Sequence, residues 1–69
     1  MRKYIPTQVE HEGRTVNAIE VHEFPTLVLS RESADAGMSN VRIHPRPDYS
    51  KDEVQQTCHW LNYREIGYP

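Results

Sequence analysis

The first part of the chain alternates between apolar and polar residues in the manner of two paired β-strands. In the first strand, expected over residues 3–11, one side of the extended chain carries Ile5, Thr7 and Val9. Pro6 lacks the N–H that an inner strand donates to its neighbour, which predicts an edge strand. A tight turn at Glu12 and Gly13 then leads into a second strand over residues 14–23, because glycine adopts a positive φ at little cost.

The length of this turn decides which residues of the two strands face each other. With a two-residue loop, the numbers of paired residues sum to 25, so that Val9 lies opposite Val16. The other side of the hairpin carries the apolar residues Tyr4, Ile19 and Val21. The pattern leaves two arrangements open: a helix covers the side with Val9 and leaves the other partly in water, or both sides are covered.

Two further strands are predicted beyond the hairpin. Residues 26–29 form an apolar run that is typical of an inner strand buried on both sides. Residues 31–40 are expected to form a loop or one frayed helical turn. Residues 41–46 alternate again, and the prolines that end this segment, Pro45 and Pro47, predict a second edge strand.

The clearest signal in the chain is the start of a helix at Ser50. Ser50 and Glu53 have the spacing of a capping box, in which each side chain bonds the backbone N–H of the other residue. Gly67 predicts that the helix ends near Ile66. One stripe of this helix carries the apolar positions that would face the sheet, Val54, Cys58 and Leu61.

These elements predict a single α+β domain over residues 1–69. We expect a small antiparallel sheet of about four strands, made of the N-terminal hairpin and two more strands, with one C-terminal helix packed on it. A chain this short buries only about 60 % of the surface that its unfolded form exposes. We therefore expect a marginally stable monomer, which gains burial from a larger partner or from a second copy in a homodimer.

Composition excludes several classes of protein. The longest apolar run is three residues, 27–29, so the sequence predicts no membrane helix, and the first twenty residues lack the apolar core of a signal peptide. One cysteine cannot form an internal disulfide, which favours a reducing, cytoplasmic compartment. The formal net charge of −2 argues against a protein that binds duplex nucleic acid.

No group of residues has the spacing of a catalytic or metal site. The short ligand spacings of zinc sites are missing among the four histidines, which are His11, His22, His44 and His59. Cys58 falls on the inward side of the predicted helix, away from any base that would activate it. Glu20 and His22 share one side of a strand, but a domain this small rarely encloses the pocket that acid–base catalysis needs. We therefore expect that the protein has no enzymatic activity and binds no cofactor and no metal.

Three surfaces remain as candidate binding sites. The first, the cationic strand face, consists of Arg42, His44 and Arg46. These side chains alternate along one strand, in a geometry that suits phosphates or carboxylates. The alternative is an ordinary solvated strand face that protects an exposed edge.

The second surface, the outer helix face, points away from the sheet and consists of Gln56, Trp60, Tyr63 and Arg64. Tryptophan, tyrosine and arginine are enriched at binding hot spots. The alternative is that Trp60 closes one end of the core.

The third surface is the loop over residues 31–40. We expect it to contact a partner through four residues, Arg31, Glu32, Asp35 and Met38. The alternative is that this loop only connects two elements of the fold.

The sequence favours a small non-enzymatic interaction module that binds and occludes a larger protein, as an inhibitor or adaptor of the kind that phages and mobile elements carry. One alternative is a homo-oligomer that binds a small anionic ligand, such as a nucleotide, between subunits. A second alternative is an RNA-binding module that uses the cationic strand face.

Overall fold

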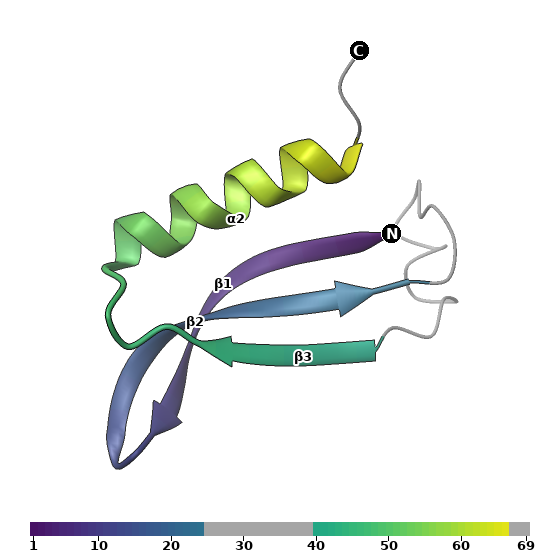
Figure 1. The fold of residues 1–69 in the computed structure, drawn as a ribbon. Helices are drawn as coiled ribbons and strands as arrows, with labels where there is room; N and C mark the ends of the chain where they lie inside the picture. The colour runs from purple at the N-terminus through teal and green to yellow at the C-terminus, as the bar shows by residue number, and fades with distance from the viewer. Residues whose placement is uncertain (25–39, 67–69) are drawn as a thin grey trace.

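The computed structural model describes residues 1–24 and 40–66, and it shows one helix lying on a three-stranded antiparallel sheet (Figure 1). The elements are β1 (Arg2–His11), β2 (Arg14–Glu23), β3 (Asn40–Pro45) and α2 (Lys51–Ile66). The order of the described strands is β1-β2-β3, so that β1 and β3 are the edges of this part of the sheet, as their prolines predicted. This confirms the α+β class. The strand expected at 26–29 and the loop at 31–40 lie outside the described residues.

The hairpin has the predicted two-residue turn. Glu12 and Gly13 have φ values of 52° and 79°, the pair of positive values that a type I′ turn requires. The register follows from this turn: Val9 pairs with Val16, and Ile5 pairs with Glu20. The predicted pairing of the hairpin is therefore confirmed.

Helix α2 begins with the predicted capping box. Ser50 Oγ accepts a hydrogen bond from the Glu53 N–H, and Glu53 Oε1 accepts one from the Ser50 N–H, both at 3.1 Å. Two N–H groups that the first turn would leave unpaired are thereby satisfied. The helix runs to Ile66, as Gly67 predicted.

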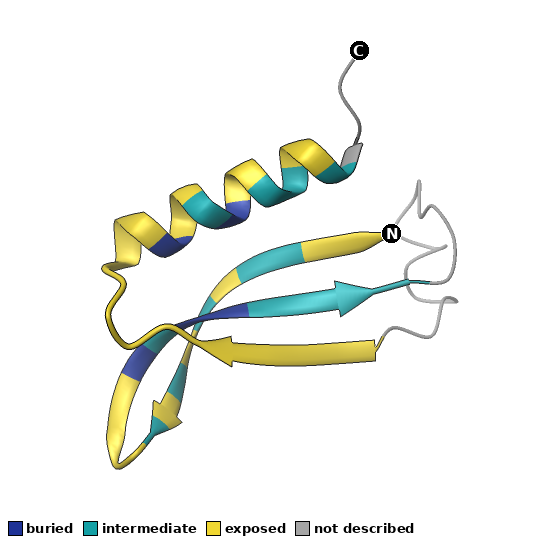
Figure 2. Ribbon diagram, viewed as in Figure 1, coloured by how far each residue is buried: buried dark blue, intermediate teal, exposed yellow. Residues whose placement is uncertain are grey.

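One cluster of buried side chains lies between α2 and one face of the sheet, while two further buried residues, Val16 and Ala18, lie on the opposite face. Ile19 on β2 packs with Val54 and Cys58 on α2, each at most 2 % exposed, and Tyr4 and Val21 pack against them. The helix therefore covers the side of the hairpin that carries Tyr4, and not the side with Val9 that the first of the two arrangements assigned to it. The buried positions of α2 form a line along its sheet-facing side (Figure 2).

Helix α2 covers only part of the sheet face on which it lies. Of the described strands, it contacts β1 and β2 but not β3 (Figure 1). Every residue of β3 is exposed, which Figure 2 shows along its whole length. At 16 residues and with a predominantly polar sequence, α2 does not qualify as a membrane-spanning helix, and no other described segment does.

Candidate functional site

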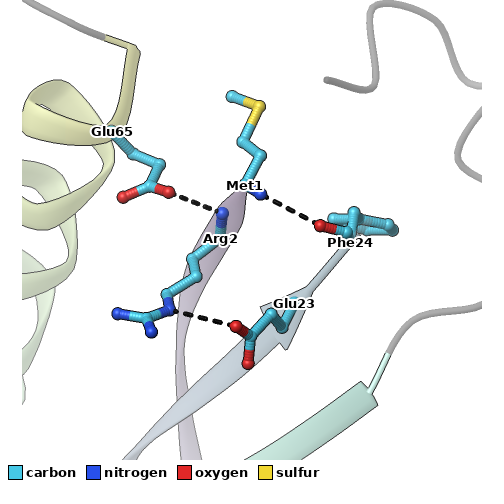
Figure 3. Close-up of polar contacts among 5 residues, drawn as sticks. All are labelled: Met1, Arg2, Glu23, Phe24 and Glu65. Atoms are coloured by element: carbon cyan, nitrogen blue, oxygen red, sulfur yellow. Dashed lines mark hydrogen bonds and ion pairs between the residues drawn. The ribbon is translucent and has the colours of Figure 1, made fainter. Parts of the chain in front are cut away.

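The outer edge of β1 is closed by two side chains of α2. The Asn62 side chain accepts a hydrogen bond from the Tyr4 N–H and donates one to the Tyr4 carbonyl, both at 2.8 Å. Glu65 Oε1 accepts a hydrogen bond from the Arg2 N–H at 2.8 Å (Figure 3). Pro6, the next residue whose backbone faces outward, has no N–H. From Arg2 to Pro6 this edge therefore offers no unpaired N–H to another strand.

The outer edge of β3 differs from that of β1. Arg46 N–H donates to the Asn17 carbonyl of β2 at 2.7 Å. In an antiparallel ladder every second residue turns its backbone groups to the same neighbour, so Arg42 and His44 also bond inward to β2. The N–H and C=O groups of Val41 and Ile43 therefore point outward. No described residue pairs with this side of β3, which we call the open edge.

The cationic strand face lies beside the open edge, on the same face of the sheet as α2. Arg42, His44 and Arg46 form one wall of a groove of about 280 Å³, and the other lining residues include Ile19 and Leu61. The structure thus brings the three predicted residues together in one place. Within the described segments, neither Arg42 nor His44 lies within ion-pair distance of a carboxylate.

A cation–π contact lies at one end of this groove, and an ion pair lies at the other. At one end, the Arg46 guanidinium lies 5.5 Å from the centre of the Tyr49 ring, within the range of a cation–π contact. At the other end, Arg2 Nε lies 3.6 Å from Glu23 Oε1, so the negative charge of Glu23 is balanced (Figure 3). A hydrogen bond to the Tyr4 side chain and the charge of Glu23 raise the pKa of the Arg2 guanidinium. The groove is therefore cationic.

The outer helix face is exposed. Trp60 is 58 % exposed and Tyr63 is 45 % exposed, and their ring centres lie 5.9 Å apart. Gln56 and Arg64 are also exposed on α2. Trp60 therefore does not close one end of the core, which was the alternative to a surface position.

The remaining candidate residues are scattered. Glu20 and His22 form a pair at 3.0 Å, half-buried on the sheet face opposite α2. Cys58 is buried, and desolvation raises the pKa of its thiol, which makes it a poor nucleophile. The four histidines lie on four different elements, and residues 1–24 and 40–66 contain no cluster of three or more potential metal ligands. The expected loop contacts Arg31, Glu32, Asp35 and Met38 lie outside the described residues.

No local pattern marks Asn62 and Glu65 as residues that close the edge of β1. Both belong to the polar part of a helix, and no local spacing connects them with residues 58 to 63 positions earlier in the chain. Only the packing of α2 against β1 brings them together.

Comparisons with models of known protein families, with curated proteins and with solved structures found no match to this chain.

Proposed function

We propose that this protein is a non-enzymatic interaction module that binds a larger protein through the outer helix face. The observation that supports this most strongly is the exposed pair of Trp60 and Tyr63. The free energy falls when a partner covers large aromatic side chains that were exposed to water. Tryptophan and tyrosine dominate the binding energy of many interfaces.

The way in which α2 is held favours the same function. Asn62 and Glu65 bond to the backbone of β1, while Val54 and Cys58 anchor the first half of the helix in the core. The helix therefore presents Trp60 from a support that is already ordered. Pre-ordering of this kind lowers the entropy cost of binding.

The proposed mechanism is steric. The aromatic pair supplies affinity, while Arg64 and Gln56 at its side supply polar contacts that set the orientation of the partner. Other molecules then lose access to the surface of the partner that the module covers, which is how an inhibitor acts. The same contact serves an adaptor where a second surface of the module binds another protein.

The test is a comparison of three bait proteins in lysate of the native host: the wild type, Trp60→Ala and the matched control His59→Ala. His59 is also exposed on α2 but lies outside the outer helix face. We expect a protein that binds the wild type and His59→Ala, and whose affinity, once it is purified, falls about 30-fold with Trp60→Ala, the effect of a hot-spot residue worth about 2 kcal/mol. Equal affinity for all three baits contradicts the proposal.

A second candidate function is the binding of a small anionic ligand between subunits, which the cationic groove favours. Arg42 and Arg46 are suited to phosphate, and Tyr49 lies beside Arg46 at the end of the groove. The test is the melting temperature of the protein with a panel of nucleotides and with single-stranded RNA. A rise at millimolar nucleotide, lost in Arg42→Ala, supports this function, and an unchanged melting temperature contradicts it.

A further inference from the structure

We infer that the open edge of β3 binds an extended segment of a partner protein as an added strand, and that this segment alternates acidic and apolar side chains. The inference rests on the proposed function only in taking a protein as the partner. The surface is a different one, because its residues lie on β3 and those of the outer helix face lie on α2.

The backbone of β3 has hydrogen-bonding groups on its outer side. Val41 and Ile43 turn their N–H and C=O groups away from β2, and nothing in the described chain pairs with them. Such a row of outward groups is what an extended peptide uses when it adds to the edge of a sheet. Natural proteins usually protect exposed edges, as β1 is protected here by Asn62 and Glu65.

On the side of the sheet that carries α2, β3 presents the cationic strand face. A strand added beside β3 places every second side chain next to Arg42 and His44. Neither has an ion-pair partner within the described residues. Carboxylates at alternate positions of the added strand would pair with them, and lysine or arginine there would be repelled.

On the opposite side of the sheet, β3 presents apolar side chains. There the neighbours of the added strand are Val41 and Ile43, each 48 % exposed, followed by the exposed Pro45. Apolar side chains in the added strand would cover these residues. The two sides of β3 together therefore favour a segment in which acidic and apolar residues alternate.

The same charges argue against a second copy of this chain as the occupant. Two β3 strands paired antiparallel across a two-fold axis keep the same face of both sheets on one side. The cationic strand faces of the two copies would then lie next to each other, which is destabilising. An acidic partner strand has no such cost.

The probe for the test is a synthetic capped peptide in which glutamate and valine alternate, titrated into the full chain. The measured quantity is the hydrogen-exchange rate of single backbone amides. In the free protein we expect fast exchange at Val41 and Ile43 and slow exchange at Tyr4. At saturating peptide, exchange at Val41 and Ile43 slows about tenfold or more, and exchange at Tyr4 is unchanged.

Two control peptides separate the parts of the argument. A peptide with lysine in place of glutamate tests the charge, and one with the same composition but with its glutamates grouped at one end tests the alternation. We expect no binding of the first and about tenfold weaker binding of the second. Equal binding of all three peptides overturns the inference, as does slow exchange at Val41 and Ile43 in the free protein.

Variants of the chain locate the site. Ile43→Pro removes one outward N–H and leaves the hydrogen bonds between β2 and β3 intact, so we expect about tenfold weaker binding. Arg42→Glu, which leaves the backbone unchanged, should reverse the preference in favour of the lysine peptide. Trp60→Ala should bind the glutamate peptide as the wild type does, which separates this inference from the outer helix face. Wild-type affinity and preference in both β3 variants overturn the inference.

Discussion

Asn62 of α2 bonds both backbone groups of Tyr4 on β1, accepting from its N–H and donating to its carbonyl, each at 2.8 Å. One amide side chain thus replaces the neighbouring strand that this edge would otherwise need. The contact also ties the second half of the helix to the sheet, beyond the core contacts of Val54 and Cys58. Among the described residues the two edges of the sheet therefore differ: β1 is closed from Arg2 to Pro6, and no residue pairs with the outer side of β3.

The replacement of Asn62 by alanine tests this contact. Two hydrogen bonds at a half-buried site are lost, and we expect the free energy of unfolding to fall by about 2 kcal/mol. Urea denaturation measures this change. His59→Ala, an exposed position of the same helix, should change the free energy by less than about 0.5 kcal/mol. Similar losses in the two variants would show that Asn62 does not close the edge.

The capping box predicts a second effect on stability. Ser50→Ala leaves the Glu53 N–H without its acceptor, so we expect a loss of about 1 kcal/mol. Ser50→Asp retains an acceptor at the same position and should keep most of the stability. Thermal denaturation followed by circular dichroism distinguishes the two variants, and equal melting temperatures of both would contradict the predicted role of Ser50.

A matched pair of substitutions compares the core with the open edge. Ile19 is 2 % exposed and Ile43 is 48 % exposed, and replacement by valine removes the same methylene group from each. We expect Ile19→Val to lower the free energy of unfolding by about 1 kcal/mol and Ile43→Val to change it by only a few tenths. An equal loss in urea denaturation would mean that Ile43 is covered in the folded protein.

Cys58 predicts a dependence of stability on pH. Burial raises the pKa of its thiol in the folded state. Below the usual thiol pKa of about 8.5, both the folded and the unfolded chain keep this proton. As the pH rises from there through the raised folded-state pKa, the unfolded chain ionises first, and the free energy of unfolding falls.

The matched control for this prediction is Cys58→Ala, which carries every other titrating group of the wild type. Urea denaturation at about pH 7.5 and about pH 9.5 should show a larger fall for the wild type than for this variant. The same fall in both proteins would contradict the assignment to Cys58.

Much of the fold follows from local features of the sequence. The two-residue turn at Glu12 and Gly13 determines the whole register of the hairpin, because each pair of residues follows from the one before. The capping box at Ser50 determines where α2 begins. Pro6 and Pro45 place β1 and β3 at the edges, since neither residue can donate to an inner ladder.

Other features depend on contacts between distant parts of the chain. Both sides of the hairpin carry apolar residues, so the choice of the side with Ile19 is made by the packing of α2 and has no local signal. The exposure of Trp60 depends likewise on how α2 is rotated on the sheet. The cationic strand face could be predicted from its alternation, but the groove beside it arises only because α2 stops short of β3.

The most direct test of the proposed function uses the fact that Trp60 is the only tryptophan of the chain. With 5-fluorotryptophan incorporated, the ¹⁹F spectrum reports on this side chain alone, whatever the partner contains. The protein captured by the wild-type bait is titrated into the labelled chain. We predict that the ¹⁹F signal moves and loses its sensitivity to exchange of H₂O for D₂O, because the partner removes water from the indole. A signal that keeps its position and its solvent sensitivity while the partner is bound would contradict the proposal that this protein acts through the outer helix face.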